Sequence, residues 1–362
     1  MKYIIDKNSK EAAYLVLYRA LRDDIISGVY TFGEKLPSKR LIADEVGVSV
    51  ITVEHAYALL CDEGYVEARE RSGYFAIFRK DDSFVSFPKE AEMHDAAYIT
   101  EEARDTETFP FSVLAKVMRR VISDYGEAIL ERSPGSGAKN LRSSIAHYLA
   151  RSRGVRVSPE QIIIGSGAEY LYGLVVELLG RERIYAIESP SYEKIEQVYR
   201  AADVKYESLP LSKDGISSRA LSKTGAEILH ITPYRSFPSG VTASASKRHE
   251  YIRWASKGER YIVEDDFESE FSVSTKPEET IFSLSENENV IYINTFSKTV
   301  SPSFRVGYMV LPKRLVAPFE EKLGFYSCTV PTFEQFVLSE LISGGDFERH
   351  INRVRRKKRR EG

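Results

Sequence analysis

Four short polar or glycine-rich segments each follow an apolar run typical of a β-strand. They are 165–168 (GSGA), 190–192 (PSY), 264–266 (EDD) and 295–298 (TFSK), with Arg305 seven residues beyond the last. Small residues at the start of a helix offer backbone N–H groups to a phosphate. Tyr192 could place an aromatic ring at the same site, and Asp265 and Lys298 would add a carboxylate and an amine. Ligands of open α/β sheets bind at the carboxyl ends of the strands, so we expect these segments to form one site.

Each of these residues, taken alone, also has a purely structural interpretation. Tyr192 is equally typical of a packed core residue, Asp265 of a helix cap and Lys298 of a surface charge. Their order along the chain, and not any single motif, favours a binding site.

The elements that must position these segments alternate between strand-like and helical patterns from about residue 98 onward. The strand-like runs are QIIIG, RIYAIES, EILHITP, RYIVEDD, VIYINTF and RVGYMVL. Alternation of this kind predicts an α/β domain with a mostly parallel sheet and helices on its faces.

The first 80 residues have a different pattern. Apolar residues at helical spacing predict a helix over 9–27, and Ser38 and Ser49 are expected to cap two further helices. Two short alternating runs around residues 71–73 predict a hairpin. Three helices and a hairpin favour a winged helix-turn-helix over residues 1–78. Residues 79–97 show no periodicity and are interpreted as a linker.

Composition and charge narrow the class of protein. The 362 residues are 43% hydrophobic and 29% charged, which is typical of a soluble globular protein. No apolar run approaches the roughly 20 residues of a membrane helix, and the N-terminus does not resemble a signal peptide. The cysteines, Cys61 and Cys328, predict neither a disulfide framework nor a metal site, so a cytoplasmic location is expected. The net charge is −2, so any affinity for DNA must come from where the charges lie.

The segment 33–76 resembles the GntR family of winged-helix regulators. The resemblance lies in LPSKR (36–40), VSVITV (48–53), EGYV (63–66) and SGYF (72–75). It implies that the third helix enters the major groove of DNA. The DNA-binding residues it implies are Ser38, Arg40, Ser49, Val50, Thr52, Arg69 and Arg71. Family members usually carry arginine where Val50 stands, and Val50 would instead contact a thymine methyl group. The alternative is a winged helix used only for protein contacts.

The remainder of the chain resembles fold-type I pyridoxal-phosphate enzymes and the regulator branch called MocR. The most specific stretch is 295–308, TFSKTVSPSFRVGY. The resemblance implies a three-layer αβα, aminotransferase-like domain over 98–350, with pyridoxal 5'-phosphate as cofactor. It also implies a Schiff base on Lys298, an ion pair between Asp265 and the pyridine nitrogen, and a ring stacked on Tyr192. The phosphate would be held by Ser166, Gly167, Ala168, Thr295, Ser297 and Arg305.

Two departures from the aminotransferase pattern argue against catalysis. Phe237 and Phe267 stand where aminotransferases carry the asparagine and tyrosine that hydrogen-bond the ring hydroxyl of the cofactor. Residues 351–362 are interpreted as the truncated start of a C-terminal subdomain, and their basic run as the solvated face of a helix.

Three functional hypotheses follow from these two resemblances. The first is a transcriptional regulator, dimeric and not membrane-bound, that binds double-stranded DNA and responds to an amine, an amino acid or the cofactor itself. The second is an aminotransferase with an appended DNA-binding domain. The third is a truncated regulator that binds DNA without sensing. Enzyme activity is left open, with a sensing role favoured.

Overall fold

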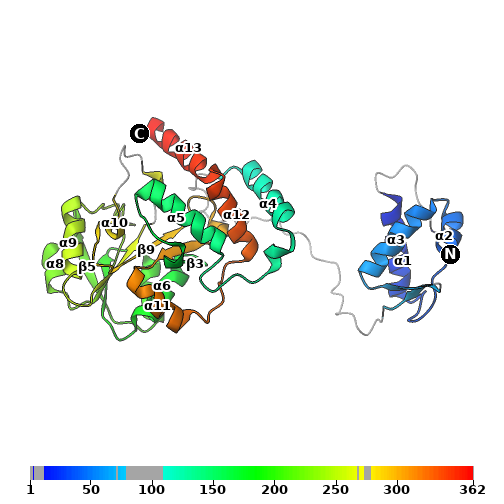
Figure 1. Cartoon of the computed structure of the whole chain (residues 1–362), viewed down its shortest axis with the longest axis horizontal. Helices are drawn as coiled ribbons and strands as arrows, with labels where there is room; N and C mark the ends of the chain where they lie inside the picture. The colour runs from blue at the N-terminus through cyan, green and yellow to red at the C-terminus, as the bar shows by residue number, and fades with distance from the viewer. Residues whose placement is uncertain are drawn as a thin grey trace. The chain divides into compact units, whose positions relative to one another are not determined.

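A computed structural model describes residues 3, 12–70, 72–78, 109–266, 269–272 and 279–361. The chain divides into two compact units, Met1–Ala96 and Ala97–Gly362 (Figure 1). The linker expected at 79–97 lies outside the described residues. The boundary between the two units falls between residues 96 and 97. Each unit is taken by itself below.

The first unit is a winged helix-turn-helix. Its elements are α1 (Ala13–Ser27), α2 (Lys39–Val46), α3 (Val50–Asp62), β1 (Val66–Arg69) and β2 (Gly73–Ala76). The Ser38 side chain accepts from the backbone N–H of Leu41, and Ser49 accepts from that of Thr52, so both serines cap helices as their type predicts. The two strands pair antiparallel, with Val66 opposite Ala76. The fold expected for this part of the chain is confirmed.

The second unit is built on an eight-stranded sheet with the order β3-β10-β9-β8-β7-β4-β5-β6. The strands are β3 (Ile162–Gly165), β4 (Tyr185–Ser189), β5 (Tyr206–Ser212), β6 (Gly215–Ile216), β7 (Ile228–Ile231), β8 (Tyr261–Asp265), β9 (Val290–Thr295) and β10 (Gly307–Val310). The pairs from β9 through β8, β7 and β4 to β5 are parallel, whereas β10 is antiparallel to both its neighbours. The sheet is therefore mostly parallel, as the alternation of patterns predicts.

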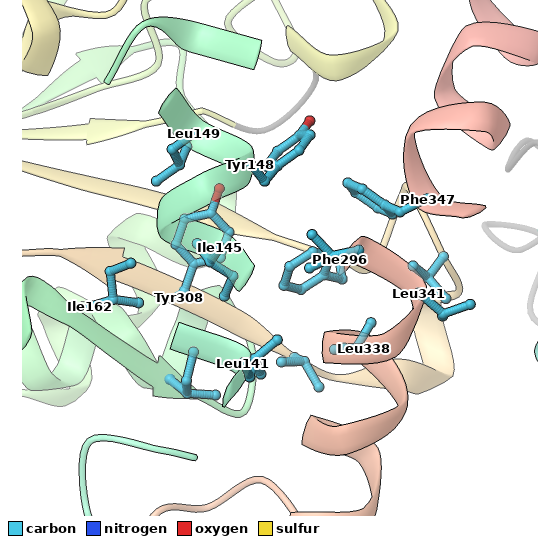
Figure 2. Close-up of a cluster of buried hydrophobic side chains, with 14 of the residues drawn as sticks. Leu141, Ile145, Tyr148, Leu149, Ile162, Phe296, Tyr308, Leu338, Leu341 and Phe347 are labelled. Carbon is cyan, nitrogen blue, oxygen red and sulfur yellow. The ribbon is translucent and has the colours of Figure 1, made fainter. Parts of the chain in front are cut away.

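Helices cover both faces of this sheet, because successive strand residues point to opposite sides. One face packs against α4 (Phe111–Tyr125), α5 (Lys139–Arg153), α8 (Ser218–Lys223), α9 (Ala245–Ala255), α10 (Ile281–Leu284), α12 (Thr332–Ser343) and α13 (Asp346–Glu361). The other face packs against α6 (Ala168–Leu179), α7 (Glu193–Ala201) and α11 (Lys313–Leu323). Figure 2 shows part of the first core, where Leu141 and Ile145 of α5 meet Leu338 of α12 and Tyr308 of β10.

One feature of the second unit differs from what the sequence indicates. Strands β5 and β6 are absent from the predicted set, because β5 lies near the sheet edge and its residues are mostly half-buried or exposed. Residues 351–361 lie in helix α13, the secondary structure expected for the basic run, and Ile351 and Val354 on this helix are buried. Among the helices of the described segments, none is long and apolar enough to cross a membrane.

Candidate functional site

The strand register brings the predicted segments to one edge of the sheet. Gly307 at the start of β10 stands opposite Gly165 of β3 on one side and Thr295 of β9 on the other. Asp265 ends the next strand, paired with Ile293 of β9. Segments 165–168, 264–266 and 295–298 therefore leave the sheet at neighbouring positions, as expected for strands that end at the same edge.

The turn between β3 and α6 forms a narrow cradle beside Arg305. Gly167 precedes the first residue of α6 and has a φ of 101°, a conformation that favours glycine. A Cβ atom at this position would lie 3.0 Å from Nη2 of Arg305. The same guanidinium nitrogen lies 2.8 Å from Oε2 of Glu169, in the first turn of α6. Only glycine leaves this approach open, so a side chain here would displace the arginine.

The backbone donors of this turn are not all directed outward. The Gly167 N–H donates to the carbonyl oxygen of Gly165 at 2.9 Å, and the Ser166 N–H donates to Oγ1 of Thr329 at 3.2 Å. The Gly167 N–H, one of the donors expected to hold a phosphate, is therefore engaged within the protein, and so is the Ser166 N–H. In this geometry an anion at the start of α6 would be met by Ala168, the side chain of Ser166 and Arg305, unless those two bonds open.

Asp265 lies in a buried polar cluster on the α6 side of the sheet. Its Oδ2 accepts a hydrogen bond from the hydroxyl of Tyr172, in α6, and lies 3.9 Å from Nε2 of His230, in β7. The other nitrogen of that imidazole, Nδ1, is 2.6 Å from the hydroxyl of Tyr199. His230 Nε2 is buried and has no hydrogen-bond partner among the described residues. Burial, and then the nearby Asp265, raise the pKa of Tyr172. The carboxylate is thus fixed in place by a tyrosine that stays protonated.

A second buried carboxylate, Glu188 at the end of β4, holds the turn that contains Phe237. Its Oε2 accepts from the hydroxyl of Ser236 at 2.5 Å and from the N–H of Thr232 at 3.3 Å. Burial raises the pKa of Glu188 to about 7, against the opposing effect of these two bonds. The two hydrogen bonds to Glu188 therefore hold the turn after β7 in place.

Tyr192, Phe237 and Lys298 lie in the segments that follow β4, β7 and β9, respectively. The rings of Tyr192 and Phe237 meet edge to face with centroids 6.2 Å apart, and Phe237 is 56% exposed. Thr295 ends β9, and Ser297 and Lys298 lie in the turn that follows; all three are half-buried. Phe267 lies outside the described residues, so its expected place beside the cofactor stays a prediction.

Asp266, the neighbour of Asp265, belongs to a different cluster on the opposite side of the sheet. Its Oδ2 lies 3.2 Å from Nη2 of the buried Arg153 and accepts from the hydroxyl of Tyr292 at 2.6 Å. Alternation along the strand separates the two adjacent aspartates. Sequence reasoning missed this cluster, as it missed Tyr172, His230 and Glu188. The one available signal was His230, a polar residue inside the otherwise apolar run ILHI.

The donor set at the sheet edge fits a phosphorylated pyridine. A glycine cradle at a helix N-terminus beside an arginine suits a phosphate. A buried carboxylate suits a protonated ring nitrogen, and Tyr192 offers an aromatic surface. No group of His, Cys, Asp and Glu side chains in the described part of the chain is arranged to hold a metal ion.

In the first unit, three of the residues expected to bind DNA serve the helix ends. Ser38 caps α2, and the Ser49 hydroxyl accepts from the Thr52 N–H at 3.1 Å and lies 2.8 Å from the Thr52 hydroxyl. Val50 begins α3 and is 41% exposed. Ser49, Val50 and Thr52 lie together at the start of α3, where a helix-turn-helix approaches DNA.

The described cationic residues that were expected to bind DNA lie on α2 and β1. Arg40 is exposed on α2. Arg69, on β1, lies over the ring of Phe75 at 4.4 Å and pairs with Glu67 at 3.1 Å. Arg71 lies outside the described residues. Lys39, which the sequence did not single out, pairs with Glu54 of α3 at 2.7 Å.

Comparison with protein families gives two matches that together cover most of the chain. Residues 13–75 match the bacterial regulatory proteins of the gntR family. Residues 104–361 match aminotransferase class I and II. The two matched segments fall within the first and second units, respectively.

Individual relatives match nearly the whole chain, and a solved structure matches about two thirds of it. The chain is 32% identical to the HTH-type transcriptional regulator YdeL of Bacillus subtilis, over 96% of this chain and 77% of the relative. It is 27% identical to the probable rhizopine catabolism regulatory protein MocR of Rhizobium meliloti, over 98% of this chain and 76% of the relative. Among solved structures, the kynurenine aminotransferase of Pyrococcus horikoshii is similar, with a TM-score of 0.62 and 27% identity, covering 70% of this chain and 65% of that one.

Proposed function

We propose, from the premise that this chain belongs to the MocR-type transcriptional regulators of the gntR family, that it binds pyridoxal 5'-phosphate at the sheet edge and adjusts its binding of DNA accordingly. The observation that carries the cofactor assignment is the register of β3, β10 and β9. It sets the cradle at Gly167 and the turn with Lys298 on either side of Gly307.

In this proposal each element of the site has one task. Arg305 and the start of α6 hold the phosphate, and Asp265 holds the ring nitrogen in its protonated form. When bound, the cofactor would supply an aldehyde for an amine to add to and an electron-withdrawing ring. Tyr172 and His230 keep the Asp265 carboxylate oriented, and Tyr192 contacts the face of the ring. Lys298 supplies the amine that attaches the cofactor.

The signal would be an amine, an amino acid or the cofactor itself, and the output would be a change in DNA binding. We expect the protein to work in the cytoplasm as a homodimer, because one winged helix contacts too few base pairs for typical specific affinity. A cofactor-dependent change in DNA affinity would distinguish this function from that of a DNA-binding protein that senses nothing.

The test is titration of the full chain with pyridoxal phosphate, followed by reduction with borohydride and peptide mapping. We expect one modified peptide containing Lys298, and none in Lys298→Ala. Lys313→Ala is a matched control, since Lys313 begins α11 at the opposite end of β10. A modified lysine that persists at another position in Lys298→Ala would overturn the assignment.

An aminotransferase with an appended DNA-binding unit is the alternative function. The similarity to the Pyrococcus enzyme favours it, whereas Phe237 in place of the usual asparagine argues against it. Mixing the cofactor-loaded protein with a panel of amino acids separates the two functions. Formation of pyridoxamine phosphate at about 1 per second or faster, an enzyme-like rate, would favour the enzyme.

A further inference from the structure

Helix α3 presents two aliphatic side chains in its first turn and no cationic lysine or arginine along its length. Its sequence, VITVEHAYALLCD, contains neither lysine nor arginine. Val53, Ala56, Tyr57 and Leu60 point into the core. By helical spacing, the opposite face is formed by Ile51, Glu54, His55, Ala58 and Asp62, and Val50 lies at its edge in the first turn. A helix with this face cannot form the bidentate arginine or lysine contact to guanine that is the commonest specific contact to DNA.

The two residues that lead this face are large and exposed. Ile51 is 64% exposed and Val50 is 41% exposed, although burial of either side chain would be favourable. Both lie in the first turn of α3, directly after the Ser49 cap. In a helix-turn-helix, the N-terminal residues of the second helix reach the base edges in the major groove.

Glu54, the charged side chain of this face that lies nearest to the first turn, is paired within the protein. Oε1 of Glu54 lies 2.7 Å from Nζ of Lys39, which begins α2. The Lys39 ammonium also lies 5.9 Å from the centre of the Tyr74 ring, so it is held between α3 and the hairpin. The pair keeps the carboxylate from repelling phosphates and leaves aliphatic groups as the surface presented to bases.

We propose that α3 recognises the C5-methyl groups of pyrimidines in the major groove, through Val50 and Ile51. Thymine displays this methyl group beside its O4 acceptor, and apolar side chains contact it. Contacts to phosphates would come from Arg40 and Arg69, outside α3. The inference rests on the proposed DNA binding and adds the chemical group that sets its sequence preference.

The test uses the full chain and DNA duplexes with a randomised core. The pool is prepared with thymine, the most tightly bound duplexes are selected, and each thymine in the best one is then replaced singly by deoxyuridine. This change removes one methyl group and leaves every hydrogen-bonding group in place. We expect at least one position to lose about fourfold in affinity, the effect of burying one methyl group.

Variants assign the effect to the two side chains. The uracil penalty is the Kd for the duplex with uracil divided by the Kd for the duplex with thymine at the same position. Val50→Ala and Ile51→Ala should each reduce this ratio toward one at the thymine that the side chain contacts. Val29→Ala is the matched control, because Val29 is 40% exposed in the turn after α1, outside the reading helix. It should keep the full penalty. A selected duplex that binds equally well with uracil at every position, or a penalty unchanged in both α3 variants, would overturn the proposal.

Two further outcomes separate related explanations. A pool with uracil for thymine and 5-methylcytosine for cytosine tells the source of the methyl group. If tightly bound duplexes are enriched from this pool, the protein also recognises the methyl group on cytosine. If none is enriched, it recognises the methyl group of thymine alone. If no pool is bound at any salt concentration, the proposed DNA binding itself is wrong, which differs from DNA binding that ignores the methyl group.

Discussion

Nη2 of Arg305 and Oε2 of Glu169 lie 2.8 Å apart, across the cradle that Gly167 keeps open. The arginine proposed to hold the cofactor phosphate is thus already paired with a carboxylate of the same chain. Any phosphate that enters must compete with Glu169 for the guanidinium. Burial opposes ionisation of Glu169, but the hydrogen bond from its own backbone N–H, and then the pairing with Arg305, lower its pKa and keep it charged.

Removing this competitor should strengthen binding of the cofactor. We predict that Glu169→Gln lowers the Kd for pyridoxal phosphate about two- to fivefold, which corresponds to a partly exposed ion pair of ~0.4–1 kcal/mol. The Kd for pyridoxal, which lacks the phosphate, should not change. Glu193→Gln, in the first turn of α7, is the control. An equal gain for pyridoxal would show that the effect does not act through the phosphate.

The same reasoning applies to Lys39, which Glu54 holds at 2.7 Å. We predict that Glu54→Gln raises the affinity for random-sequence DNA, because the released ammonium can contact a phosphate. The slope of log Kd against log salt should steepen by about 0.9. Glu45→Gln makes the same change in net charge on the exposed side of α2 and serves as the control. Equal slopes for the two variants would contradict a direct contact.

Arg40 should contribute a contact that is independent of sequence. Arg40→Ala is predicted to weaken binding to selected and random duplexes by the same factor and to reduce the salt slope by about 0.9. Arg22→Ala, on α1 and paired with Asp23 at 2.8 Å, is the control and should leave the slope unchanged. A loss confined to the selected duplex would mean that Arg40 reads bases.

Local patterns were sufficient to predict the strands that carry the site, since each apolar run ends in a polar turn. They also identified Ser38 and Ser49 as helix caps, a role decided within three residues. The pairs Tyr172–Asp265, His230–Asp265 and Glu188–Ser236 join residues far apart in the sequence. Only the packing of α6 and the order of the strands bring them together, so no spacing along the chain predicts them.

The backbone donors show a second kind of limit. The sequence GSGA correctly indicates a tight turn into a helix, but whether the Gly167 N–H points outward depends on the peptide plane between Ser166 and Gly167, which the torsion angles of Ser166 set. In the structure that N–H donates to the carbonyl oxygen of Gly165. A serine at 166 is compatible with more than one orientation of this plane, so the residue types alone could not decide the direction.

Glu188 gives the second unit a predicted dependence of stability on pH. Burial raises the pKa of this carboxyl from 4.5 to about 7, so between these values the folded state binds more protons than the unfolded state. Stability contributed by Glu188 is therefore present below pH 4.5 and is lost as the pH rises toward 7. The loss should total about 3 kcal/mol, from 1.36 kcal/mol per pKa unit. A glutamine can still accept both hydrogen bonds through its carbonyl oxygen and has no proton to lose.

We therefore predict that the free energy of unfolding of Glu188→Gln, relative to that of the wild type, increases by about 3 kcal/mol as the pH rises from 4.5 to 7. The measurement is denaturant unfolding followed by fluorescence of the single tryptophan, Trp254, which is buried in the second unit and reports on that unit. For Glu321→Gln, at an exposed position on α11, the free energy of unfolding should depend on pH in the same way as for the wild type. A constant difference between Glu188→Gln and the wild type across this range would mean that Glu188 is already ionised in the folded protein at pH 5.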